Sequence, residues 1–106
     1  MPAKPAPLDP ATVASRLAAL PGWSHVDGWL QRDYATDGWR STMLLVNAIA
    51  FLAEAADHHP DLGVHWGRVD VRLQSHDAGG VTERDMALAA RIAALVHDQP
   101  IGWVTS

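Results

Sequence analysis

The sequence predicts an α+β domain in which three helices cover one face of a four-stranded antiparallel sheet. Three observations support this fold. Two neighbouring segments alternate apolar and polar residues, as strands do, and an Asp-Gly pair typical of a hairpin turn separates two other strand-like runs. Three further segments repeat apolar residues at helical spacing. The order helix, two strands, helix, two strands, helix favours two packed layers.

The composition describes one globular domain. A chain of 106 residues is long enough for a single core, which we expect over residues 9–106, after a flexible, proline-rich arm over residues 1–8. The net charge of -4 and the single lysine disfavour direct nucleic-acid contact. The lack of cysteine excludes a disulfide framework and a thiolate zinc site. No run resembles a signal peptide or a membrane span, so a cytoplasmic protein is expected.

The first helix and the first hairpin have clear local signals. Asp9 can cap free backbone N–H groups and Pro10 suits the first helical position, while Pro21-Gly22 stops the helix. One face of this helix is apolar, through Val13, Leu17 and Leu20. Asp27-Gly28 then joins strands over 23–26 and 29–35.

The second predicted helix covers residues 39–57, with Asp37 as its N-cap. Its middle, residues 43–53, is apolar almost all round, whereas an exposed helix keeps a polar face. We therefore expect this helix to be covered twice, by its own sheet and by another subunit. The predicted assembly is a homodimer or homotetramer formed through helix 39–57.

The second half of the chain predicts a hairpin and a capped helix. Strands are expected over 62–66 and 69–73, with a turn at Gly67-Arg68. Thr82 and Asp85 form a capping box at the start of the last helix. Its predicted buried stripe is Met86, Ala89, Ala90, Ala93 and Val96. Gln99-Pro100 ends this helix, and the tail is expected to pack through Trp103.

Three histidines are placed for chemistry near neutral pH. His58 and His59 end the long helix in front of Pro60, and His76 follows the last strand. Glu54 and His58 are four residues apart, so on a helix they share a face, and Glu54 is predicted to orient His58. The His59 ring points about a third of a turn away, so the two adjacent rings cannot serve the same purpose.

Other interpretations of these histidines remain open at this stage. His58 and His59 also suit a helix C-terminus for electrostatic reasons, with His76 as an ordinary loop residue. A pair of histidines and a distant third also suit a metal site with three ligands. Adjacent histidines diverge on a helix, unlike the i, i+4 pair of helical zinc motifs. We therefore expect no metal.

The ordered pattern resembles the signature of the pterin-4a-carbinolamine dehydratases. It consists of Glu54-x-x-x-His58-His59-Pro60, Trp66, Val69-x-Val71-x-Leu73-x-Ser75-His76 and Gly80-Val81-Thr82-x-x-Asp85. Trp66 stands where tyrosine is usual, Ser75 where threonine is usual, and Leu62 where an aromatic residue is frequent. The last of these departures affects the lining of the pocket rather than its chemistry.

The resemblance implies a hydro-lyase, 4a-hydroxytetrahydrobiopterin dehydratase. Such an enzyme removes water from 4a-hydroxytetrahydropterin to give quinonoid dihydropterin, which restores the cofactor spent by aromatic amino acid hydroxylases. The family fold it implies, a four-stranded sheet with three helices in dimers or tetramers, agrees with the pattern-based prediction. The resemblance calls for no metal and no organic cofactor.

The resemblance also implies the roles of the site residues. Loss of hydroxide from C4a needs a proton on the departing oxygen while a ring N–H loses its proton, and imidazole can act at either end. His58, His76 and His59 would be the catalytic residues, the first two as acid and base and His59 mainly holding the pterin. The substrate would be lined by Asp57, His58, His59, Gln74, Ser75 and His76. Relatives that assist a transcription factor or protein assembly imply an alternative, a protein-binding module docking through the apolar helix.

Overall fold

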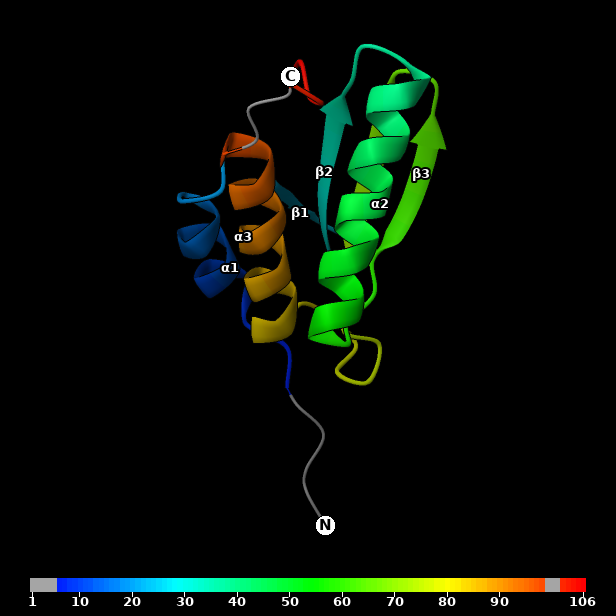
Figure 1. Ribbon diagram of the computed structural model, residues 1–106. Coiled ribbons are helices and arrows are strands. Elements are labelled where there is room, and N and C mark those ends of the chain that lie inside the picture. Colours follow the sequence, from blue (N-terminus) through cyan, green and yellow to red (C-terminus); the bar gives the residue numbers. More distant parts are fainter. Residues whose placement is uncertain (1–5, 99–101) are drawn as a thin grey trace.

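The computed structural model describes residues 6–98 and 102–106. Its elements are α1 (Pro10–Leu17), β1 (Ser24–Val26), β2 (Trp29–Ala35), α2 (Trp39–Ala56), β3 (Asp61–His65), β4 (Arg68–Leu73) and α3 (Glu83–Asp98). The four strands pair antiparallel in the order β1-β2-β4-β3. All three helices lie on one face of the sheet, with α3 between α1 and α2 (Figure 1). The predicted α+β fold and its element order are confirmed.

The core forms where the helices meet the alternating strands. On β4 the side chains of Val69, Val71 and Leu73 are fully buried. Arg68 and Arg72, which alternate with them along the strand, are exposed on the opposite face. The register of β2 on β4 places Leu30 opposite Leu73, so their side chains point to the same face and both are buried.

The described helices include none that is long and apolar enough to cross a membrane.

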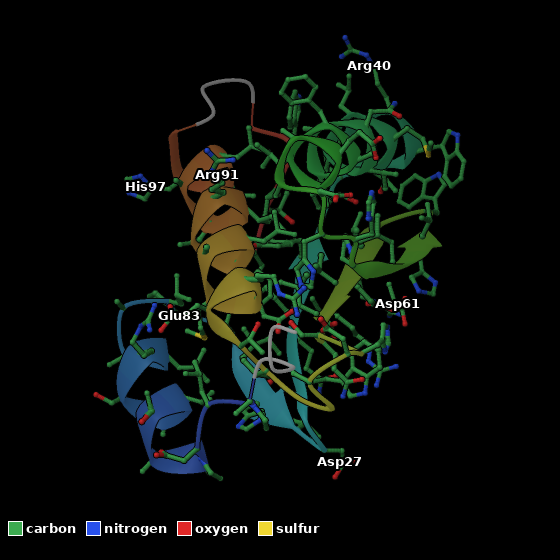
Figure 2. The ribbon with its side chains drawn as sticks, turned by 90° about the horizontal axis from the view of Figure 1, so that it is seen from below. Asp27, Arg40, Asp61, Glu83, Arg91 and His97 are labelled. Carbon is green, nitrogen blue, oxygen red and sulfur yellow. The ribbon has the colours of Figure 1, made fainter. Side chains whose placement is uncertain are left out.

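The first hairpin turns as predicted. Asp27 and Gly28 have φ angles of 52° and 83°, which a tight two-residue turn requires. Figure 2 shows Asp27 at the tip of this hairpin, pointing away from the body of the molecule. The turn of the second hairpin lies one residue earlier than predicted, at Trp66-Gly67, because Arg68 already pairs with His65 as the first residue of β4.

The predicted start of α2 at Trp39 is confirmed, whereas its predicted N-cap and its predicted end are corrected. Asp37 is not the N-cap, since Gly38 occupies that place and the Asp37 carboxylate instead accepts a hydrogen bond from the Ser41 hydroxyl. The helix ends at Ala56 rather than residue 57, because Asp57 adopts the left-handed conformation with φ 49°. This change of one residue redirects the two histidines that follow.

The ends of the described chain are attached to the domain. The Asp9 carboxylate accepts a hydrogen bond from the Thr12 amide at 2.7 Å, which confirms the cap of α1. Leu8, assigned to the flexible arm, donates its amide to the Val81 carbonyl and packs on the core. Residues 1–5 lie outside the described residues. Trp103 packs against the core as predicted.

α3 buries a wider surface than the predicted stripe. Ala90 is exposed, while Leu88 and Ile92, which the prediction left out, are buried at 1% and 0% exposure. The reason is that α3 lies between two other helices (Figure 1), so apolar side chains on both sides of the stripe are covered. Glu83 in its first turn reaches α1, where it pairs with Arg16 at 2.6 Å (Figure 2). The described part of α3 ends at Asp98, and the predicted stop at Gln99-Pro100 lies outside the described residues.

Candidate active site

The three predicted histidines meet at one end of the domain. The C-terminal end of α2, the loop after β4 and the start of α3 lie together there (Figure 1). Between them is a pocket of about 250 Å³. It is lined by Asp57, His58, His59, Gln74, Ser75, His76, Asp77 and Arg84. Each residue predicted to line the substrate therefore borders this pocket, and Glu54 does not.

The end of α2 separates the two adjacent histidines. The amide of His58 donates to the Ala53 carbonyl at 3.1 Å, and the amide of Asp57 donates to the Glu54 carbonyl at 3.2 Å. These two bonds around a left-handed residue form the Schellman ending of a helix. Because the chain reverses here, the His58 side chain turns inward and is only 10% exposed, whereas the His59 side chain is 57% exposed.

The partner of His58 is Asp85, on the first turn of α3. Nε2 of His58 lies 2.5 Å from Oδ1 of Asp85, and both side chains are buried. Oδ2 of Asp85 accepts two further hydrogen bonds, from the Ser75 hydroxyl and from the Thr82 amide, each at 2.8 Å. Both carboxylate oxygens of Asp85 are thus used within the fold. With a carboxylate at this place, Nε2 is the donor and Nδ1 is the ring nitrogen left for other partners.

The predicted pairing of Glu54 with His58 is wrong. Oε2 of Glu54 lies 2.8 Å from Nε2 of His59, and both of these side chains are largely exposed. The i, i+4 argument assumed that the helix continues through residue 58. Since it ends at Ala56, the reversed chain brings His59 rather than His58 back alongside Glu54.

Asp85 was visible in the sequence only as a capping residue. The amide of Thr82 donates to its carboxylate, so the predicted capping box is confirmed. The second role of this carboxylate, as the partner of His58, depends on how α2 and α3 pack. Residues close to Asp85 in the sequence do not predict it. The occurrence of Asp85 in the family pattern was the available clue.

His76 lies in an exposed loop that is fixed at its base. The amide of Ser75 donates to the Gly80 carbonyl at 2.9 Å, which closes the loop. In the described residues the His76 ring has no hydrogen-bond partner, and its aromatic neighbour is Trp29, with ring centroids 5.6 Å apart. His76 is thus the exposed counterpart to the buried His58 at this pocket.

Two of the residues predicted to bind substrate use their side chains within the fold. The Gln74 amide nitrogen donates to the Gly28 carbonyl at 3.0 Å, which ties the first hairpin to the end of β4. The Ser75 hydroxyl is buried and donates to Asp85. The backbone of Ser75 is also used within the fold, since its amide donates to the Gly80 carbonyl and its carbonyl accepts from the amides of Ala78 and Gly79.

The sequence analysis did not identify Arg84 as a site residue. Its guanidinium pairs with the Asp77 carboxylate at 2.5 Å across the pocket lining. This hydrogen bond and the Arg84 charge hold the pKa of Asp77 below its usual value. The ion pair places the Arg84 guanidinium beside the histidines, with its charge balanced by the Asp77 carboxylate.

A metal site would need several ligating side chains close together. In the described part of the chain, no three His, Cys, Asp or Glu side chains gather closely enough to hold a metal ion. The arrangement instead offers one buried, oriented imidazole and two exposed ones. This set is suited to proton transfer on a bound molecule.

Comparison with known proteins identifies the family of the chain. A protein of Thermomicrobium roseum, named provisionally as a pterin-4-alpha-carbinolamine dehydratase, is 48% identical over 83% of this chain and 95% of its own length. An Aquifex aeolicus protein with the same provisional name is 46% identical over 81% of this chain and 87% of its own. The crystal structure of a Brucella melitensis protein described as a transcriptional coactivator/pterin dehydratase superposes with a TM-score of 0.80. It is 32% identical, covering 84% of this chain and 97% of that one. The family model for pterin 4 alpha carbinolamine dehydratase matches residues 6–95, so the chain belongs to that family.

Proposed function

We propose that this protein dehydrates 4a-hydroxytetrahydropterin to quinonoid dihydropterin by acid/base catalysis. The observation that carries the proposal is the meeting of His58, His59 and His76 at one small pocket, with His58 held by the buried Asp85. Membership of the pterin dehydratase family supports the substrate class. A pocket of about 250 Å³ is of the right order for part of a small, flat heterocycle.

The proposed chemistry divides between the two sides of the pocket. The bond from C4a to its hydroxyl oxygen breaks, the oxygen takes a proton and leaves as water, and the ring N–H gives its proton to a base. His58 and His76 are the proposed acid and base. Asp85 accepts from Nε2 of His58, so it fixes the tautomer in which Nδ1 can take part. His59 and the backbone at Gln74 are proposed to hold the pterin, and Arg84 adds a donor on the rim.

The test is the rate of water loss from freshly generated 4a-hydroxytetrahydropterin, measured with and without the protein. We expect acceleration that falls at least about 100-fold in His58→Ala and in His76→Ala, the usual range for a lost proton-transfer group. His65→Gln is the matched control, because this exposed histidine of β3 pairs with Asp70 of β4 and neither residue lines the pocket. No acceleration by the folded wild-type protein would overturn the proposal.

A second proposed function is binding of another protein chain through α2. Four large apolar side chains on α2 and the β3–β4 hairpin are exposed: Trp39 (53%), Phe51 (73%), Val64 (40%) and Trp66 (70%). The Trp66 ring lies beside Gly38, next to Trp39, so part of this surface is continuous. We propose that a second copy of the chain covers it, in a homodimer or homotetramer, with a transcription factor or an assembly client as the alternative occupant.

Sedimentation of the wild-type protein and of Phe51→Asp tests this second function. We expect an oligomer at micromolar concentration that shifts toward monomer in the variant, because a buried unpaired carboxylate is costly. A wild-type monomer would refute self-association and direct the search to other partners. Ala94→Asp, an exposed substitution on α3 and outside the proposed surface, is the control for added charge.

A further inference from the structure

The first hairpin supplies a support for the loop that carries His76. Gln74, just before the loop, is bonded to the Gly28 carbonyl in the hairpin turn. The next residue of the hairpin, Trp29, lies against the His76 ring at 5.6 Å between centroids, with the ring planes 75° apart. An edge-to-face arrangement at this distance is a favourable aromatic contact. Two separate interactions therefore connect the same turn to the same loop.

The Trp29 ring is itself fixed by a cation. The guanidinium carbon of Arg72 lies 4.3 Å from the centroid of the Trp29 ring, which is cation–π distance. In the described residues Arg72 has no carboxylate partner. Arg72 comes from β4 and Trp29 from β2, both on the sheet face away from the helices. The contact runs from the sheet through Trp29 to an otherwise unsupported histidine.

We propose that Trp29, held by Arg72, is a positioning residue that keeps the His76 ring in one orientation at the pocket. His58 does not need such a device, because Asp85 holds it. His76 has no comparable polar partner among the described residues, and it is exposed in a loop outside the helices and strands. The expected effect of Trp29 on turnover rests on the proposed dehydratase function, whereas its expected effect on the orientation of the His76 ring does not.

The structural test follows the His76 ring by NMR in protein with isotope-labelled histidine, assigned with His76→Ala. In the wild-type protein we expect His76 signals displaced by the Trp29 ring current. Trp29→Leu is expected to abolish that displacement and average the side-chain couplings, with the His58 signals unchanged. Averaged couplings already present in the wild-type protein, or couplings unchanged in Trp29→Leu, would overturn the proposal.

Conservative variants separate positioning from general packing. Trp29→Phe keeps an aromatic ring and is expected to retain the fixed His76 orientation, and Arg72→Gln to loosen it in part. Val26→Ala is the matched control, because Val26 pairs with Trp29 in the hairpin and is likewise partly exposed. Loss of the orientation in Val26→Ala as well would assign the effect to the hairpin as a whole and overturn the role of Trp29.

Kinetics then measure the consequence for the reaction. The free energy of one aromatic contact corresponds to about 2- to 10-fold in the population of the oriented ring. We expect Trp29→Leu to lower kcat by about that factor with KM changed less than about 2-fold, and Trp29→Phe to restore most of it. If the wild-type protein shows no turnover, the proposed function fails and the NMR result alone decides the role of Trp29. Unchanged kcat with a disordered ring would refute the catalytic consequence.

Discussion

Replacing Asp85 by asparagine tests the buried part of the site most directly. Oδ2 of Asp85 accepts hydrogen bonds from both Ser75 and Thr82. Asparagine has a single side-chain oxygen, which must take the place of Oδ2 to accept these two bonds. The amide NH₂ group then faces Nε2 of His58, which must become an acceptor. The ring proton moves to Nδ1, and His58 presents the opposite tautomer to the pocket.

The magnitudes follow from the bonds that change. Two hydrogen bonds lose their charge assistance and a favourable charge is removed from the first turn of α3, at about 1 kcal/mol or less for each. The total, about 1–3 kcal/mol, corresponds to a decrease in Tm of roughly 5–15 °C for a domain of this size. The wrong tautomer removes a proton-transfer group, which lowers kcat by about 100-fold or more.

The assay combines thermal unfolding with the rate of pterin dehydration. Glu83→Gln is the control, since it removes an exposed charge from the same helix turn. In the double variant His58→Ala with Asp85→Asn, kcat is expected to equal that of His58→Ala alone, because Asp85 acts through His58. A folded Asp85→Asn protein with kcat within about 3-fold of the wild type would refute this assignment.

Four further outcomes are expected. Glu54→Gln changes kcat by less than about 3-fold, since Glu54 pairs with the exposed His59, and steady-state kinetics check it. Leu73→Ala lowers the free energy of unfolding by about 2–5 kcal/mol, measured in urea, because this side chain is fully buried. Arg68 holds the pKa of Asp70 below 3.8, so the Asp70 carboxylate stabilises the fold above pH 3.8, and this stabilisation is lost as the pH falls through the lowered pKa. Asp70→Asn should therefore weaken the acid-induced fall in the free energy of unfolding, measured by urea unfolding at several pH values. Burial raises the pKa of Tyr34 above 10.0, so stability present below pH 10 is lost as the pH rises through the raised pKa, and Tyr34→Phe should reduce that loss.

Local sequence signals predicted most of the fold. The alternation of Val69, Val71 and Leu73 and the Asp27-Gly28 turn depend on neighbours along the chain, and the structure agrees with both. The errors arose where packing decides. The exposure of Ala90 depends on where the neighbouring helices lie, which helical spacing alone does not contain.

The site was predicted as a set of residues but not as a set of contacts. The residue pattern identified the histidines that line one pocket. It could not assign their partners, because the left-handed conformation of Asp57 decides which ring turns inward, and aspartate adopts that conformation only occasionally. The pairing of His58 with Asp85 joins residues 27 positions apart, beyond the range of any helical spacing rule.

The double use of the Asp85 carboxylate bears on how activity is inferred in related sequences. As the cap of α3 it serves folding, and a descendant that had lost all catalysis would still be selected to keep it. Folding does not require the His76 ring in this way, because the ring is exposed and has no hydrogen-bond partner among the described residues. An aspartate at the position of Asp85 therefore does not show whether a related protein is catalytically active. The histidine positions are the ones that distinguish enzymes from relatives that have lost activity.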